Sequence, residues 1–100
     1  MVFKTVKEFE HAGYKCEIVE VGFTPHTRLS HNGYVTVPED HPCYRKHYYN
    51  IDQDVTELTF SSEGKFGFDT NHSYDNESTK SLEAVIAVTK QLAEYFGQVK

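Results

Sequence analysis

The fold is decided by residues 58–69, which read Leu-Thr-Phe-Ser-Ser-Glu-Gly-Lys-Phe-Gly-Phe-Asp. Apolar residues occupy every second position on both sides of the Ser-Glu-Gly turn. Such alternation around a short turn that contains glycine is typical of a β-hairpin. We therefore expect a strand over about 56–61 and a return strand over 65–69, with one apolar face.

Two further strands are expected upstream of this hairpin. Tyr14, Cys16 and Ile18 alternate with charged residues, which predicts a strand over about 14–22 with a bulge where the alternation slips. A second strand over 33–37 is closed by Pro38. Between this strand and the hairpin, residues 39–50 form an irregular loop rich in tyrosine and histidine, and loops of this length inside a compact domain are usually functional.

Both ends of the chain show the spacing of helices. The C-terminal stripe comprises Leu82, Val85, Ile86, Leu92, Ala93 and Phe96. Ser78 or Thr79 is expected to cap this helix and Gly97 to end it. Near the N-terminus, Val2, Phe3, Val6 and Phe9 recur at helical spacing before a glycine at position 13. The expected fold class is α+β: one domain over residues 1–100, with a small antiparallel sheet packed by a long C-terminal helix and a short N-terminal helix.

The charge of the chain argues against direct binding of DNA or RNA. Ten basic and fifteen acidic residues give a net charge of −5, and the longest basic stretch is confined to residues 44–48. Proteins that bind nucleic acid need a basic surface to neutralise phosphates. An acidic surface instead suits docking onto a larger basic protein.

The remaining composition indicates a cytoplasmic protein. Cys16 and Cys43 are too few for a disulfide scaffold, so both are expected to be free thiols. The sequence contains no charged-then-apolar leader and no apolar run of membrane-spanning length. These features favour a reducing compartment without contact with a membrane, and they do not determine an oligomeric state.

Residue types that bind metals gather in the loops around the middle strands. Asp69 and His72 follow the return strand of the hairpin, and at such a corner residues three apart can converge on one point. His31 and His41 flank the strand at 33–37. Because imidazole and carboxylate groups bind zinc, these four residues are the predicted zinc ligands, with Cys43 and Asp75 as alternatives.

Several short motifs resemble a family of small phage and prophage proteins, most of which have no assigned activity. The motifs are His-x-x-Gly-Tyr-Val from His31, His41-Pro42, Leu58-Thr59-Phe60, and Gly-Phe-Asp-x-x-His ending at His72. Relatives often carry Val-His-Gly-Gly before the Leu-Thr strand and a cysteine before the late histidine, and this chain has Val-Thr-Glu and Thr-Asn there. The resemblance implies a phage context, in which small acidic domains often inhibit host defence, as zinc-binding anti-CRISPR proteins do.

The sequence therefore predicts a small acidic inhibitor, an anti-CRISPR protein with a structural zinc, that docks on a Cas9-type effector of a bacterial host. Such an effector carries positively charged channels that an acidic protein can occupy. The expected contact residues are Glu39, Asp40, Tyr44, Tyr48, Tyr49, Asp52, Asp54, Glu77 and Glu83. The alternatives are a zinc-dependent hydrolase, with Asp69 or Asp75 as ligand or base, and a purely structural domain.

Overall fold

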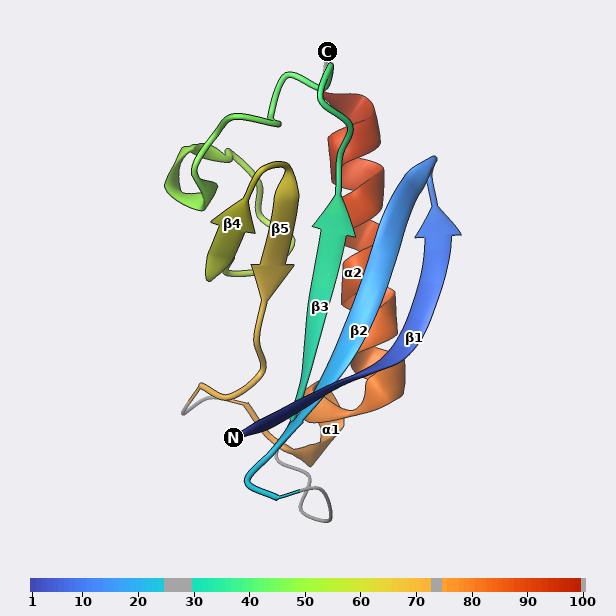
Figure 1. The fold of residues 1–100 in the computed structure, drawn as a ribbon, viewed down its shortest axis with the longest axis vertical. Coiled ribbons are helices and arrows are strands. Elements are labelled where there is room, and N and C mark those ends of the chain that lie inside the picture. Colours follow the sequence, from blue (N-terminus) through green and yellow to red (C-terminus); the bar gives the residue numbers. More distant parts are fainter. Residues whose placement is uncertain (25–29, 73–74, 100) are drawn as a thin grey trace.

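The computed structural model describes residues 1–24, 30–72 and 75–99, and within them it contains one five-stranded sheet. The strands are β1 (Val2–His11), β2 (Tyr14–Gly22), β3 (Ser30–Thr36), β4 (Phe60–Ser62) and β5 (Lys65–Phe68). Their order across the sheet is β1-β2-β3-β5-β4, and every neighbouring pair is antiparallel (Figure 1).

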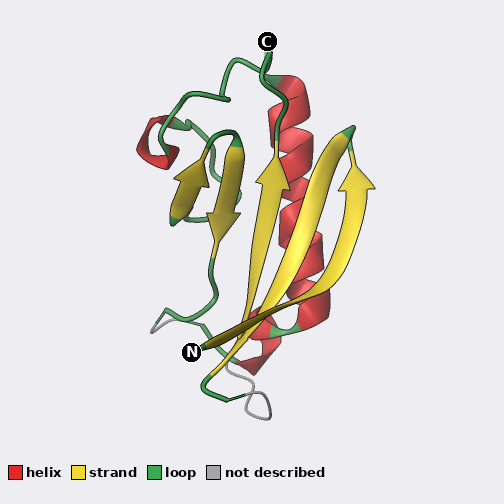
Figure 2. Ribbon diagram, viewed as in Figure 1, coloured by secondary structure: helices red, strands yellow, loops and turns green. Residues whose placement is uncertain are grey.

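A long helix, α2 (Leu82–Gln98), covers one face of this sheet, preceded by the short helix α1 (Glu77–Lys80) (Figures 1 and 2). The buried sheet residues that face α2 include Ile18, Val35 and Phe66, and α2 contributes Leu92 and Phe96. The apolar stripe predicted for the C-terminal helix is therefore the core face of α2. The α+β class, with an antiparallel sheet under a long C-terminal helix, is confirmed.

The predicted N-terminal helix is wrong, because residues 2–11 form the long edge strand β1. Val6 has no partner in the register between β1 and β2, which shifts between Thr5 and Lys7. This bulge changes the phase of the alternation, so apolar residues on a strand recur at spacings that resemble a helix. Phe3 and Val6 are exposed and do not form a core stripe. The short helix α1 lies directly before α2, toward the other end of the chain.

Two hairpin turns of the same kind connect the strands. Ala12 and Gly13 have φ of 54° and 88°, and Glu63 and Gly64 have φ of 46° and 85°. Two successive residues with positive φ are the signature of a type I′ turn, whose twist matches that of the strands. The hairpin predicted around Glu63 is confirmed, although β4 is only three residues long.

Helix α2 begins and ends with side-chain hydrogen bonds. The hydroxyl of Ser81 accepts from the backbone N–H of Ala84, at 3.2 Å, and thereby caps the first turn. At the other end, the carbonyl of Phe96 accepts from the hydroxyl of Tyr14, at 3.3 Å. The predicted caps at positions 78 and 79 instead belong to α1, whose N-cap is Asn76.

The chain between β3 and β4 is a long wrapping segment, residues 37–59, which we call the β3–β4 loop. It contains one short 3-10 helix, η1 (Tyr48–Asn50). Val37, Cys43, Ile51 and Leu58 are buried in the core, and they fix the path of the loop at four points. The loop is therefore an ordered surface without extensive secondary structure of its own.

Within the described parts of the chain, neither helix has the length and apolar character required to cross a membrane.

Candidate functional site

The predicted zinc ligands fall at two ends of the molecule. His31 lies beside Lys80, with 2.7 Å from its Nδ1 to the Lys80 carbonyl, whereas His41 lies beside Phe96. Lys80 precedes the break at Ser81, and Leu82 and Phe96 are 14 positions apart within α2, a rise of roughly 21 Å. Because zinc ligands lie about 2.0–2.3 Å from the ion, one ion cannot bind both histidines in this structure.

His41 is instead a helix-capping residue at the C-terminal end of α2. Its Nε2–H donates to the carbonyl of Phe96, at 2.9 Å, and its Nδ1 accepts from the N–H of Cys43, at 3.0 Å. The two bonds require a neutral ring with the proton on Nε2. The rings of Tyr14 and Phe96 pack edge-on against it, at 5.6 and 5.8 Å between centroids. This geometry engages both nitrogens that could otherwise bind a metal.

His31 joins three elements at the opposite end. Its Nδ1 donates to the Lys80 carbonyl, and its Nε2 lies 3.7 Å from the Glu20 carboxylate. The hydroxyl of Thr70 donates to the backbone carbonyl of His31, at 2.8 Å. His31 therefore ties β3 to α1 and to the turn that follows β5, close in the fold to Asp69 and His72.

The structure does bring Asp69 and His72 together, and Asp75 with them. The Nδ1 of His72 lies 3.0 Å from Oδ2 of Asp75 and 3.4 Å from Oδ1 of Asp69. The backbone N–H of His72 also donates to Asp75, at 3.0 Å, and the N–H of Asn71 donates to Asp69, at 3.1 Å. The expectation that an Asp-x-x-His corner converges is met, and the nearest carboxylate is that of Asp75.

The environment of Asp75 favours its charged form. Burial raises the pKa of this carboxyl, but hydrogen bonds from the backbone and ring of His72 and from Thr79 more than offset the burial and lower it below its usual range. A negative Asp75 is therefore the partner that orients the His72 ring.

Glu57 is the member of this cluster that the sequence did not indicate. Its Oε2 lies 3.7 Å from Nε2 of His72, on the side of the ring away from Asp75. Among the described residues, no group of three or more His, Cys, Asp or Glu is arranged to bind a metal. The carboxylates of Asp69 and Asp75 each accept a backbone hydrogen bond on one oxygen, and the zinc site stays a prediction.

An exposed aromatic cluster lies on the β3–β4 loop. The rings of His47, Tyr48 and Tyr49 contact one another, with centroids 4.3, 4.6 and 4.9 Å apart. The backbone N–H of Tyr48 donates to the hydroxyl of Ser61 on β4, at 3.1 Å, which fastens the cluster to the sheet. Tyr49 is 81% exposed. Tyrosines with this exposure on a fixed loop are typical of protein-binding surfaces.

Both cysteines are free, as expected; both are also buried, and neither is an activated nucleophile. Burial raises the pKa of Cys16 to about 11, and it raises the pKa of Cys43. A nucleophilic cysteine needs the opposite shift, toward the thiolate. His41 also bonds to the backbone of Cys43 rather than to its thiol.

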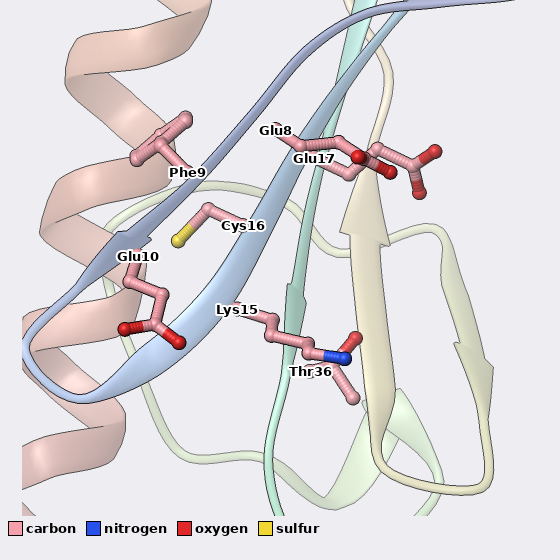
Figure 3. A pocket seen from close by; sticks show the side chains of 7 residues that line it. All are labelled: Glu8, Phe9, Glu10, Lys15, Cys16, Glu17 and Thr36. Carbon is pink, nitrogen blue, oxygen red and sulfur yellow. The ribbon is translucent and has the colours of Figure 1, made fainter.

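A shallow cavity of about 360 Å³ lies over β1 and β2 around Cys16 (Figure 3). Its lining residues are Glu8, Phe9, Glu10, Lys15, Cys16, Glu17 and Thr36. Figure 3 shows that the Cys16 and Phe9 side chains turn toward the helix, whereas those of Glu8 and Glu17 lie together on the open face. The Cys16 thiol in this cavity is therefore protonated and turned away from solvent, and it is not an activated nucleophile.

Comparison with known proteins returns no match among protein-family models, curated proteins or solved structures. The function is therefore inferred from the β3–β4 loop, with its aromatic cluster, and from the cluster of Asp69, His72 and Asp75.

Proposed function

We propose that this protein acts by binding, as a small acidic phage-type inhibitor that docks through its β3–β4 loop on a larger basic host nuclease of the Cas9 type. The proposal rests on the exposure and packing of Tyr49. Its side chain is 81% exposed, and its ring contacts the rings of His47 and Tyr48. Exposed tyrosines of this kind are the residues that most often supply binding energy in protein interfaces.

The loop is also preorganised for binding. Cys43, Ile51 and Leu58 anchor it in the core, and Tyr48 is bonded to Ser61. A surface that is already ordered loses little conformational entropy when a partner binds. This supports a role in recognition for the loop, even though it contains little regular structure.

The charge of the loop supports a basic partner. Exposed acidic residues on it are Glu39, Asp40, Asp52, Asp54 and Glu57. Together with the net charge of −5, they would steer the protein toward a basic channel and away from bare DNA or RNA. The proposed place of action is the cytoplasm of a bacterial host.

The proposal is tested by pull-down of purified Cas9-type effectors and by their DNA cleavage in the presence of the protein. Wild type should bind and inhibit, and association should slow as salt rises. Tyr49→Ala should weaken binding by about tenfold or more. Glu77 and Glu83 are contact residues expected from the sequence, but α1 and the first turn of α2 lie toward the opposite end of the molecule from η1 (Figure 2), so both fall outside the proposed docking surface. Glu77→Gln with Glu83→Gln is therefore the control and should bind like wild type.

Two results would contradict this proposal. If wild type neither binds nor inhibits any such effector, docking on this class of partner is rejected. If the protein instead hydrolyses an ester, phosphoester or peptide with metal-dependent turnover, the zinc-hydrolase alternative replaces it. In that case the cluster of Asp69, His72 and Asp75 would be the place to look for the catalytic residues.

A further inference from the structure

A second cavity, of about 330 Å³, opens beside η1 on the β3–β4 loop. It is lined by Tyr48, Tyr49, Gln53, Glu57, Leu58 and Thr59. The lining thus combines two aromatic rings, one carboxylate and an apolar floor, and none of these described lining residues is basic. This combination is suited to a side chain that carries both a positive charge and an apolar stem.

The aromatic wall of the cavity is formed by Tyr48 and Tyr49, whose ring centroids lie 4.6 Å apart with a 38° tilt between the planes. The face of a tyrosine ring carries negative potential, and it attracts a cation placed over it. Because Tyr49 is 81% exposed, much of its ring surface is accessible to a partner.

Glu57 lines the same cavity; its side chain is 65% exposed, and one of its carboxylate oxygens lies 3.7 Å from Nε2 of His72. A hydrogen bond with Tyr49 is the largest cause that raises the pKa of Tyr48, and the charge of Glu57 is the smallest. Glu57 is the acidic side chain of the cavity lining.

The floor of the cavity is held by hydrogen bonds within the loop. The Gln53 amide donates to the carbonyl of Thr56, at 2.6 Å, and accepts from the N–H groups of Val55 and Thr56, at 2.8 and 3.2 Å. Leu58 below is 6% exposed. The cavity is therefore already formed before any partner binds, which favours a specific occupant.

We propose that this cavity receives an arginine side chain of the protein partner, stacked on the Tyr48–Tyr49 wall and paired with Glu57. Arginine fits better than lysine because its planar guanidinium can lie flat on an aromatic ring while its N–H groups bond to a carboxylate. The inference rests on the proposed function, since it names the partner group that the β3–β4 loop would bind.

The test uses short capped peptides and the full-length protein, observed by NMR of the tyrosine rings. The probes are acetyl-Gly-Arg-Gly-amide, the same peptide with lysine, and the same peptide with citrulline, which keeps the shape of arginine without the charge. The arginine peptide should shift the Tyr48 and Tyr49 resonances saturably. The lysine peptide should bind about fivefold more weakly, and the citrulline peptide should produce no saturable shift.

Two variants assign the effect to the cavity. Glu57→Gln keeps the size of the side chain and should weaken binding of the arginine peptide by about fivefold or more. Glu8→Gln removes an exposed acidic group on the edge strand β1, outside the cavity and outside the β3–β4 loop, and it should change the affinity little. The inference is overturned if the arginine peptide gives no saturable shift, if citrulline binds as well as arginine, or if Glu57→Gln binds like wild type.

The outcomes of the two experiments can be separated. Saturable arginine binding without capture of any Cas9-type effector would reject that partner and retain the cavity. Capture of an effector without any arginine binding would reject the cavity and retain the docking proposal.

Discussion

The carboxylate of Glu57 lies 3.7 Å from Nε2 of His72, although the two residues are 15 positions apart in the sequence. Glu57 belongs to the β3–β4 loop and lines the cavity beside Tyr49, whereas His72 belongs to the turn after β5 and is held by Asp75. The aromatic loop and the histidine–aspartate corner therefore form one continuous surface, on which a change at His72 can affect the position of Glu57.

We expect zinc binding to depend on His72 and to be independent of His41. Purified without a tag from zinc-replete medium, wild type and His41→Ala should carry about one zinc ion per chain, and His72→Ala should carry much less. The reason is that Asp69 and Asp75 lie within 3.4 Å of the His72 ring, whereas His41 caps the far end of α2. Elemental analysis gives the count, and a wild-type content below about 0.2 ions per chain would reject a zinc site.

We expect His41→Ala to destabilise the protein by about 2 kcal/mol. The substitution leaves the Cys43 N–H without its acceptor and removes one donor from the Phe96 carbonyl. Urea unfolding measures the loss, and nitrogen-15 NMR of the wild-type ring should show the neutral tautomer protonated on Nε2. A ring protonated on Nδ1 at neutral pH would contradict the capping geometry.

Gly33 is expected to be a position where no side chain is tolerated. A Cβ on Gly33 would overlap the hydroxyl of Thr89 and lie 2.6 Å from the Phe68 ring, because β3 passes close under α2. Gly33→Ala should therefore lower the free energy of unfolding by about 1–3 kcal/mol.

The matched control is Gly97→Ala, near the end of α2. The nearest atoms to a Cβ there are 3.9 Å away, in Tyr14. Alanine should stabilise this helical position by about 0.5–1 kcal/mol. Equal unfolding curves for the two variants would show that the close approach at Gly33 is not a constraint.

The two X-Gly turns explain what the sequence predicted well and what it did not. Glu63-Gly64 lies between two segments with clear alternation, so the sequence predicts a hairpin turn there. Ala12-Gly13 has similar positive φ values, but the bulge at Val6 disturbs the alternation before it. Gly13 therefore resembles a helix end, because local spacing does not distinguish a bulged edge strand from a short helix.

The candidate metal site was only partly predictable, because some of its contacts are local in the sequence and others depend on the tertiary fold. Asp69 and His72 are three residues apart, and their proximity follows from local geometry. His31 lies in β3 and His41 follows its end. The predicted strand over 33–37 that stands between them is already about 17 Å long, so their separation could have been anticipated from the strand itself. The position of Glu57 depends on the path of the β3–β4 loop, which is set by distant core contacts such as those of Ile51 and Leu58.

Glu17 is expected to make the stability of the sheet depend on acidic pH. Its carboxylate accepts from Lys65, at 2.8 Å, and from Thr5, at 2.6 Å, on the open face of the sheet. The hydrogen bonds from Lys65 and Thr5 exceed the effect of burial and lower the pKa of Glu17 below its usual 4.5. In the unfolded chain the group regains its ordinary pKa, so the unfolded state binds the proton more readily.

Glu17 therefore stabilises the folded protein fully when the pH is above its pKa in the unfolded chain. This stabilisation is lost as the pH falls through the lower pKa that Glu17 has in the folded protein. Glu17→Gln should therefore cost about 1 kcal/mol at pH near 7, and it should cost almost nothing at a pH below the folded pKa. Urea unfolding across this range measures the difference between the two proteins, with Glu39→Gln on an exposed loop as the control. A difference that stays constant with pH would show that Glu17 stabilises the sheet without its charge.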